Sequence, residues 1–399
     1  MLTTDQNNRA EKLENIVFLV LFIAWFTLDF LFNIDIDSFS WSTEANYLHL
    51  LSPIKYCMMI YIFLFRRYSV RNWIIIFGVG ILLFVSARRS EYYVILYAWL
   101  FIVAAKPEMI DRVIRVTFFL SLLYVILTVI SALTGVLPNT FNRRGTEIRM
   151  ALGFTHPNQL AFRILILAGC YTWLRRSSWR WMDDLVLFLV ILILRFIANS
   201  LTSTLCAGLL LMAMLFRFIY TKLDGRWRSG VLWIIVMGTF CLNALFFILT
   251  FCYSDSGFTK TVSDIMSRRL EFGHQAFKDF GVSFLGQVVY LTKGEREFAG
   301  LAEELIVDNA YIHLLLREGI LVFLIVNAGY FLCQVKAVKR NDYYTTVLLA
   351  IMAFYGSGET MLFWAMGNVF LIFLTDLFRH TDRDATIWEH GSKLLKRAV

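Results

Sequence analysis

Hydrophobic stretches alternate with short polar segments along this chain, roughly every 25 to 40 residues, from near the N-terminus to about residue 378. Each is close to the roughly 20 residues that an α-helix needs to cross a bilayer. They predict helices, because an open sheet leaves backbone hydrogen bonds unsatisfied in lipid. Twelve spans are predicted, at about residues 16–32, 47–65, 72–87, 92–105, 113–134, 159–174, 184–199, 202–220, 231–251, 310–331, 342–356 and 360–378.

The spans at 72–87 and 92–105 are short and form either two full crossings or a re-entrant pair, which gives 11 or 12 crossings. No internal repeat or linker-like segment divides the chain, so residues 1–399 are interpreted as one integral membrane domain, an all-α helix bundle. The first span follows a polar leader without a small-residue cleavage site and is predicted to be retained. One long connection, residues 252–309, has a length that favours a functional role.

Composition supports this class, because 58% of the residues are hydrophobic, too many for a soluble core with a polar surface. The six cysteines show no CxxC or metal-like spacing and are interpreted as small apolar packing groups. A net charge of +8 raises the question of nucleic acid. Most lysines and arginines lie in short loops beside spans, however, so the charge is a topology signal and no nucleic-acid partner is expected.

Alternate connections carry the positive charge, and the positive-inside rule places them, with both termini, in the cytoplasm. The acidic connection from Asn33 to Asn46 and the long connection 252–309 then lie outside. The residues assigned to the cytoplasm are Arg9, Lys12, Arg66, Arg67, Arg71, Lys106, Arg112, Arg115, Arg175, Arg176, Arg180, Lys222, Arg226, Arg228, Lys336, Lys339, Arg340, Lys393, Lys396 and Arg397.

This topology leaves a group of arginines on the outer side, where few positive charges are expected. Arginine suits planar, bidentate contacts with phosphate or carboxylate oxygens, so the group predicts a cationic outward cavity. Alternatively, each pairs with a local acid such as Glu91, Glu147 or Glu271, or reaches lipid phosphates. Arg163 and Arg195 lie within spans, where a charge must be paired or functional. The group comprises Arg88, Arg89, Arg143, Arg144, Arg149, Arg163, Arg195, Arg268 and Arg269.

The turn Gly153–Asn158 predicts the start of an inward-running helix. Thr155 or His156 can cap it, and Pro157 suits its first turn because the missing N–H would be unpaired there. The positive end of the helix dipole would face outward and could hold an anion. Gln159 and Arg163 share a face below it. A well-capped helix start with no further role is the alternative.

A second group of polar residues surrounds the end of the long connection. Ser267–Phe277 predicts a short helix that carries Arg269. Asp308 precedes the tenth span, where a carboxylate is either a helix cap or a catalytic group. Asn309, His313 and Arg317 recur every four residues and predict a polar stripe that enters the bilayer.

Three blocks in this order carry a family resemblance: GFTHPNQLA at 153–161, SRRLEFGHQAF with the following glycine turn at 267–286, and DNAYIHLLLREGI at 308–320. Together with the many spans and the late outer loop, they resemble the Wzy-type polymerases of bacterial O-antigen, capsule and exopolysaccharide repeat units, in the O-antigen ligase and polymerase superfamily. The related ligases carry His-Asn where this chain has Asp308-Asn309. That departure favours a polymerase and puts in doubt any mechanism that needs a histidine base there.

The resemblance implies a metal-independent membrane glycosyltransferase, similar to the GT-C type, on the outer face of the bacterial cytoplasmic membrane. It would transfer a growing glycan from undecaprenyl diphosphate to the non-reducing end of a new lipid-linked oligosaccharide repeat unit, with release of undecaprenyl diphosphate. A flippase and a chain-length regulator of the same pathway are the implied protein partners. No cofactor is expected, and no HExxH pattern on the outer side suggests a metal.

Within that reaction, Arg269 and Arg144 are the expected diphosphate clamp, since preorganised positive charge stabilises a departing diphosphate. Asp308 is the candidate base for the acceptor hydroxyl, with His156 and His313 as alternatives. Further contacts to the diphosphate are expected from Arg143, Arg163, Arg195, Arg268, His156 and Asn158.

Three other functions remain open at this point. A ligase that transfers finished polymer to another acceptor shares nearly every feature and separates only at Asp308-Asn309. A flippase or other transporter of lipid-linked oligosaccharide needs no chemistry, but such proteins usually show internal repeats and charges near the midplane. A scaffold or length regulator would place most of its mass in coiled or soluble domains, which the sequence does not predict.

Overall fold

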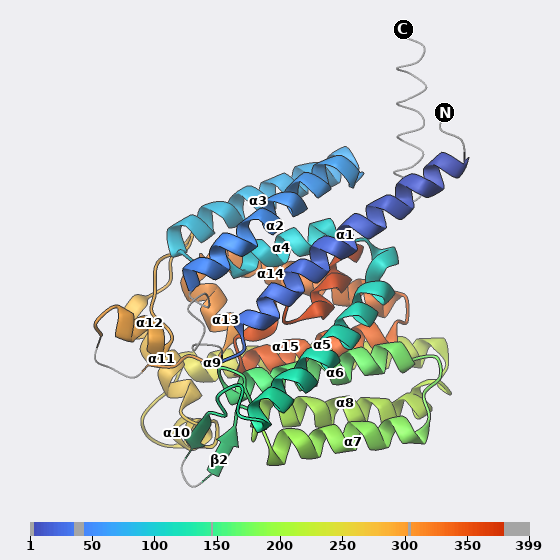
Figure 1. Ribbon diagram of the computed structural model, residues 1–399. Helices are drawn as coiled ribbons and strands as arrows, with labels where there is room; N and C mark the ends of the chain where they lie inside the picture. The colour runs from blue at the N-terminus through green and yellow to red at the C-terminus, as the bar shows by residue number, and fades with distance from the viewer. Residues whose placement is uncertain (1–3, 36–43, 145–146, 302–304, 379–399) are drawn as a thin grey trace.

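A computed structural model describes residues 4–35, 44–144, 147–301 and 305–378, which form a helical bundle with one small β-hairpin (Figure 1). The first part comprises α1 Thr4–Phe32, α2 Glu44–Phe65, α3 Val70–Ser90, α4 Val94–Ala104, the 3₁₀ turn η1 Pro107–Met109, α5 Ile110–Leu133, β1 Phe141–Arg144, β2 Glu147–Met150, α6 Pro157–Arg175, α7 Trp181–Phe196, α8 Leu201–Tyr220 and α9 Gly225–Phe251. The second part comprises α10 Phe258–Ile265, α11 Arg269–Phe280, α12 Lys293–Phe298, α13 Ala310–His313, the π-helix η2 Leu314–Glu318, α14 Gly319–Lys339, α15 Tyr343–Gly358 and the 3₁₀ helices η3 Met361–Phe363 and η4 Val369–Phe378.

Six of the described helical stretches are long and apolar enough to cross a membrane, which confirms the all-α, membrane-embedded class. The predicted count of twelve crossings and their orientation stay predictions. The six stretches are Glu11–Phe32, Val70–Ser90, Pro107–Leu133, Leu201–Tyr220, Gly225–Phe251 and Ala310–Lys339, and shorter apolar helices occupy His49–Phe65, Val94–Ala104 and Val369–Phe378.

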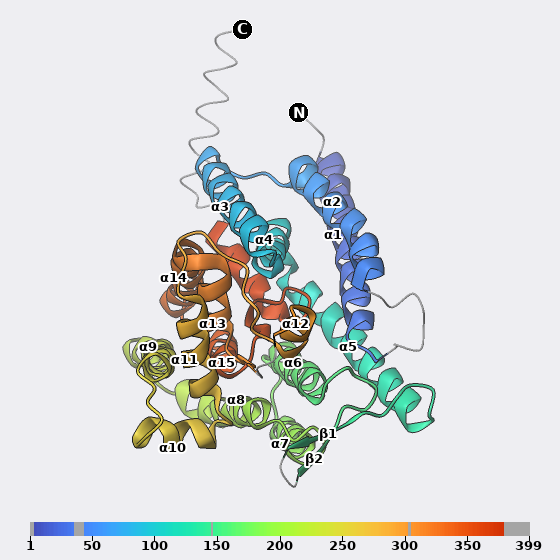
Figure 2. The ribbon, with the colours of Figure 1, turned by 90° about the vertical axis from the view of Figure 1, so that its left-hand side faces the viewer.

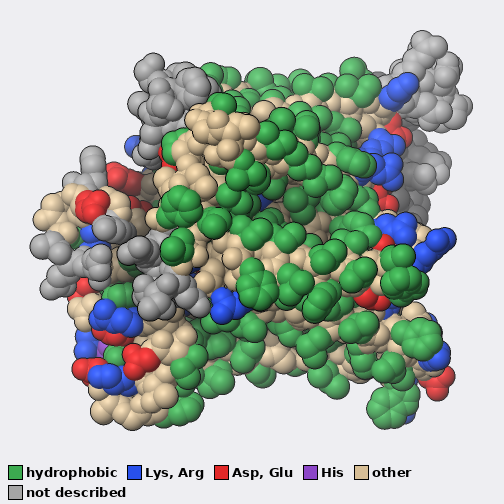
Figure 3. Space-filling model, turned by 60° about the horizontal axis from the view of Figure 1, so that its bottom comes forward, with side chains coloured by type: hydrophobic (Ala, Val, Ile, Leu, Met, Phe, Trp, Pro, Cys, Tyr) green, Lys and Arg blue, Asp and Glu red, His purple; other side chains and the backbone are tan. Residues whose placement is uncertain are grey.

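The surface agrees with a bilayer environment. On the face in Figure 3, hydrophobic side chains cover the middle of the molecule, and charged side chains gather at two opposite ends. α10, α11 and α12 lie together at one of these ends, to the left in Figure 1 and toward the viewer in Figure 2. The connection 252–309 therefore covers one end of the bundle.

α15 lies in the centre of the bundle, with nearly all of its side chains buried against α8, α9 and α14. The two short predicted spans differ from each other, because α3 has 21 residues whereas α4 has only 11 and packs under α2 and α3. The last predicted span, 360–378, is irregular, with η3 and η4 separated by a bend. Its backbone is buried in protein, the condition under which non-helical backbone is tolerated at membrane depth.

The predicted span 310–331 is also interrupted. A π-helical turn leads to Gly319, whose φ of +85° is the left-handed conformation that glycine adopts at little cost. At this break the backbone N–H of Ile320 donates to the carbonyl oxygen of Ser283 at 3.0 Å. The long connection 252–309 is thus hydrogen-bonded directly to the interrupted helix, and this positions α11 and α12.

Gly319→Ala is expected to destabilise the protein by roughly 1 to 3 kcal/mol, because a side chain disfavours this backbone conformation. A Cβ at this position would also lie 2.5 Å from the backbone nitrogen of Gly286. The matched control is Gly329→Ala on the same helix, where the Cβ would meet only Leu377, at 3.9 Å. Melting temperatures of the purified variants in detergent measure the effect; equal values for the two variants would contradict it.

Candidate functional site

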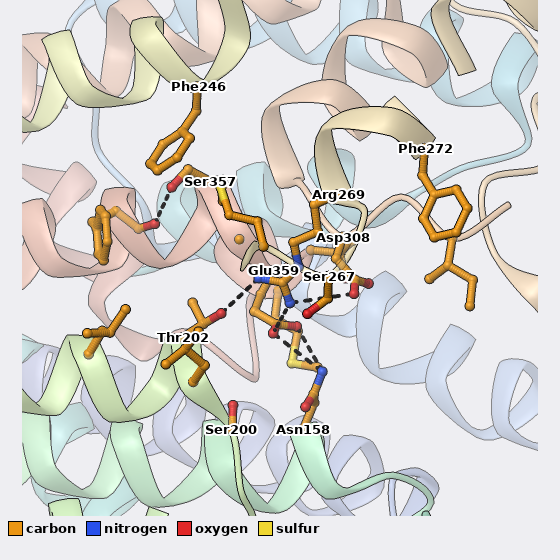
Figure 4. Close-up of a pocket in the computed structure, with 18 of the residues that line it drawn as sticks. Asn158, Ser200, Thr202, Phe246, Ser267, Arg269, Phe272, Asp308, Ser357 and Glu359 are labelled. Carbon is orange, nitrogen blue, oxygen red and sulfur yellow. Dashed lines mark hydrogen bonds and ion pairs between the residues drawn. The ribbon is translucent and has the colours of Figure 1, made fainter. Parts of the chain in front are cut away.

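A cavity of about 560 Å³ lies at the end of the bundle that α10 and α11 cover. Segments far apart in the sequence line it: the start of α6, the start of α8, the α10–α11 turn, Asp308 shortly before α13 and the end of α15 (Figure 4). Its polar lining residues include Arg149, His156, Asn158, Gln159, Ser200, Thr202, Ser267, Arg269, Asp308, Ser357, Glu359 and Thr360.

Arg269 begins α11 and points into this cavity. Its Nη1 donates to Thr202 Oγ1 at 2.9 Å, and its Nη2 donates to Glu359 Oε1 at 2.9 Å. The same Nη2 lies 3.6 Å from Asp308 Oδ2. A Cβ on Gly358 would lie 2.9 Å from Nη1, so the glycine there permits the close approach of the guanidinium. Arg269 and Asp308, which the sequence assigns to one site, therefore line the same cavity.

Glu359 is the residue that the sequence reasoning missed. It follows α15 directly, with only 3% of the residue exposed. Besides Arg269, Asn158 donates from Nδ2 to Glu359 Oε2 at 3.2 Å. Burial raises the pKa of the Glu359 carboxyl, and Arg269 opposes this shift. The sequence did contain a sign of it, because Glu359 is a single acid between two apolar stretches. A charge there costs free energy unless it is paired or functional.

The predicted helix start at His156 and Pro157 is confirmed. His156 is the cap of α6, and its Nδ1 accepts from the backbone N–H of Asn158 at 3.1 Å. Burial lowers the pKa of His156, and Arg149 adds to this shift while Asp308 opposes it. A neutral imidazole whose Nδ1 accepts a hydrogen bond carries its proton on Nε2. His156 thus acts as a cap, which leaves it poorly placed to remove a proton.

Arg149, at the end of the hairpin, is the second arginine of the cavity. Its Nε donates to the carbonyl oxygen of Ala198 at 3.2 Å, and its Nη2 donates to Asn158 Oδ1. Asn158 therefore connects Arg149 to Glu359. The sequence placed Arg149 in the outer arginine group but did not include it in the site, because its proximity to Glu359 depends on tertiary contacts.

Asp308 is the most accessible carboxylate of the site, with 35% of its side chain exposed. The interpretation of Asp308 as a helix cap is wrong, because the cap of α13 is Asn309. Asn309 Oδ1 accepts from the backbone N–H of Tyr311 at 2.9 Å and of Ile312 at 3.1 Å. Asp308 is therefore available for another role.

Several of the other predicted arginines lie away from the cavity. Arg163 is 1% exposed and pairs with Asp29 at 3.2 Å inside the bundle, and it also donates to Met366 O at 3.1 Å. Arg195 donates to Asn199 Oδ1 at 2.5 Å on the surface. The exposed Arg268 pairs with Glu271. Arg163 and Arg268 are thus paired with acids, which was the alternative explanation, whereas Arg195 contacts a neighbouring amide.

Arg143 and Arg144 belong to β1, which pairs with β2 in an antiparallel hairpin. Their side chains lie outside the described residues, so their expected role in the diphosphate clamp stays a prediction. The second strand of the hairpin, β2, carries the cavity residue Arg149.

The polar stripe on the tenth span binds neighbouring backbone and the long connection. The amide of Asn309 donates to Ser357 O at 2.9 Å, and His313 Nε2 lies 2.7 Å from Val307 O. Arg317 Nη2 donates to Glu295 of α12 at 2.6 Å and lies over the Tyr92 ring. These contacts hold the connection that carries α11, and none of the three residues lines the cavity.

The fold and the cavity define a membrane-embedded helical protein with an arginine–carboxylate site at one end of the bundle. No protein family, no curated protein and no solved structure matches this chain. Within the described ranges, no three His, Cys, Asp or Glu side chains are grouped so that they could hold a metal ion. The metal independence expected from the resemblance stays a prediction.

The raised pKa of Glu359 predicts a pH-dependent contribution to stability. The native state binds more protons at this group than the unfolded state, so its contribution is complete below the ordinary value of 4.5 and is lost as pH rises through the folded pKa. The stability of wild type relative to Glu359→Gln should therefore fall as pH increases, because glutamine cannot ionise whereas the buried Glu359 must.

Melting temperatures of the two proteins from pH 4.5 to about 8 test this. The range begins at the ordinary pKa of a glutamate carboxyl and extends through the higher pKa of the folded state. Glu271→Gln is the control, because Arg268 lowers the pKa of Glu271, so the contribution of Glu271 is complete above 4.5 and should stay nearly constant over this range. Parallel curves for wild type and Glu359→Gln would show that Glu359 does not titrate differently on unfolding.

Proposed function

We propose that this protein is a bacterial polysaccharide polymerase of the Wzy type, which joins oligosaccharide repeat units carried on undecaprenyl diphosphate at the outer face of the cytoplasmic membrane. The observation that carries the proposal is the convergence of Arg269 and Arg149 with the accessible carboxylate Asp308 in one cavity. All three sequence blocks that resemble this family contribute to the polar centre: 153–161 with Asn158, 267–286 with Arg269, and 308–320 with Asp308.

In the proposed reaction, the acceptor hydroxyl oxygen attacks the anomeric carbon of the donor sugar. The bond from that carbon to the diphosphate oxygen breaks, and undecaprenyl diphosphate leaves with the electron pair. The hydroxyl proton passes to Asp308, whose side chain is exposed enough to contact a sugar. Glu359 has almost no exposed surface and instead holds Arg269 and Asn158 in position.

Arg269 retains donors for the leaving diphosphate. A guanidinium has five N–H groups, and Thr202 and Glu359 accept from two of them. The cavity arginines Arg149 and Arg269 face the carboxylates Asp308 and Glu359, so their charges balance before substrate binds. A diphosphate would therefore gain most when Glu359 takes up a proton, which its raised pKa favours.

The test is polymerisation by the purified protein in lipid nanodiscs, with lipid-linked repeat units extracted from a strain that lacks this gene and with EDTA present. The proposal expects a ladder of longer lipid-linked glycans. Transfer of preformed polymer to another acceptor without a ladder would indicate a ligase. Movement of the units across proteoliposomes without any new glycosidic bond would indicate a transporter, and loss of the ladder in EDTA would overturn metal independence.

A further inference from the structure

The cavity has a charged side and an apolar side. The charged side holds Arg149 of β2, Arg269 of α11, Asp308 before α13 and Glu359 after α15. Figure 4 shows Phe246 of α9 and Thr202 of α8 reaching the cavity from opposite directions. The apolar lining comes from Leu201 and Leu205 of α8, Phe246 of α9, Ile265 of α10 and Phe354 of the central helix α15.

α8 and α9 diverge toward this cavity. A short turn joins them at the far end, after Tyr220, where Leu223 N donates to Tyr220 O. Both pack on α15, but within the described part of the chain they make few contacts with each other. Leu205 is 50% exposed and Ile265 is 71% exposed, although both line the cavity. The cleft between α8 and α9 thus joins the charged site to the lipid-facing surface.

We propose that the α8–α9 cleft, with α15 as its floor, holds the isoprenoid chain of a lipid whose diphosphate group binds Arg269 and Arg149. The diphosphate is the leaving group of the proposed function, on which the inference rests. A lipid with an anionic head group and a long apolar tail needs a site in which positive side chains adjoin an apolar surface that is open to the bilayer. The cleft provides this continuity over Leu205 and Phe246.

A second apolar groove offers an internal comparison. It has a volume of about 450 Å³ and lies between α2, α3 and α4, with Phe63, Phe77 and Phe84 among its lining residues. Its one basic lining residue is Lys55, whose Nζ lies 3.3 Å from the Tyr97 ring centroid. This groove has apolar surface but no arginine, so it should accept ordinary lipid chains without selecting a diphosphate.

The experiment is photo-crosslinking with radiolabelled undecaprenyl diphosphate, which carries no sugar, in nanodiscs of phosphatidylethanolamine and phosphatidylglycerol. A photoreactive amino acid replaces Leu205 in one protein and Phe63 in the other, both half or more exposed to lipid. We expect about tenfold more label at position 205, which corresponds to a preference of about 1.4 kcal/mol. Excess inorganic diphosphate should reduce that label by competing for the arginines.

Equal labelling at the two positions, or labelling at 205 that neither inorganic diphosphate nor Arg269→Ala reduces, would overturn the inference and indicate general lipid contact. Position 201, also on α8 and exposed, serves as a second probe site if the variant at 205 is poorly produced. Crosslinking needs no turnover. Selective label without any glycan ladder would therefore reject the proposed polymerase and support the lipid site. A ladder without selective label would support the polymerase and reject the lipid site.

Discussion

Arg269→Ala is expected to lower the rate of polymer formation by about two to three orders of magnitude, the typical effect of removing one preorganised donor from a developing negative charge. Arg269 reaches the cavity from α11 and contacts Thr202, Glu359 and Asp308 at once. Arg269→Lys should recover only part of the rate, because an ammonium cannot make the same planar, forked contacts. Initial rates of glycan formation with purified variants measure both effects.

Loss of Arg269 also leaves the buried Glu359 without its cation, and breaking a buried pair in this way costs roughly 3 to 5 kcal/mol. The double variant Arg269→Ala/Glu359→Gln separates this cost from catalysis, since it should regain stability but remain inactive. Arg268→Ala is the matched control, because Arg268 is exposed and pairs with Glu271 outside the cavity. Full activity of a folded Arg269 double variant would disprove the diphosphate role.

Asp29→Ala is expected to destabilise the protein by roughly 3 to 5 kcal/mol, because it leaves the guanidinium of Arg163 inside the bundle without its carboxylate. Asp29 Oδ2 accepts from Arg163 at 3.2 Å, and Asp29 Oδ1 accepts from Trp364 Nε1 at 2.8 Å. The guanidinium carbon also lies 4.7 Å from the Trp364 ring centroid. This cluster joins α1, α6 and the irregular segment after η3.

The double variant Asp29→Leu/Arg163→Leu should recover much of the lost stability, because it removes both charges together. Asp255→Ala is the control, since the exposed Asp255–Lys260 pair at 3.0 Å should leave the melting temperature nearly unchanged. Melting temperature in detergent and the KM for lipid-linked substrate are measured together. A higher KM for Asp29→Leu/Arg163→Leu with unchanged stability would show that Arg163 contributes to diphosphate binding.

Local pattern was sufficient for features that depend on neighbours in the sequence. The apolar stretches predict helices because lipid forces backbone groups to pair within each segment. The cap at His156 and Pro157 follows from the chemistry of a helix start, and it is present. The polar centre also lies at the three blocks chosen from the sequence, with Arg269 and Asp308 3.6 Å apart.

Local pattern failed where the partner lies far along the chain. Glu359 joins Asn158, which is 201 residues away, and Arg269, which is 90 residues away, so no spacing rule connects them. The polar stripe of the tenth span has a regular spacing, but His313 and Arg317 bind the preceding connection, at Val307 and Glu295. The sequence predicts one uninterrupted span at 310–331, whereas the helix is interrupted at Gly319.

The sequence by itself determined that this is a helical membrane protein, that its long connection carries α11, and that arginines and one aspartate form the candidate site. Only the tertiary structure decided which arginines belong to that site. Arg149 and Arg269 converge on Glu359, whereas Arg163 is committed to Asp29. The physical reason is that a buried charge is placed by its partner, and partners in a helix bundle come from segments whose order along the chain does not reveal which ends meet.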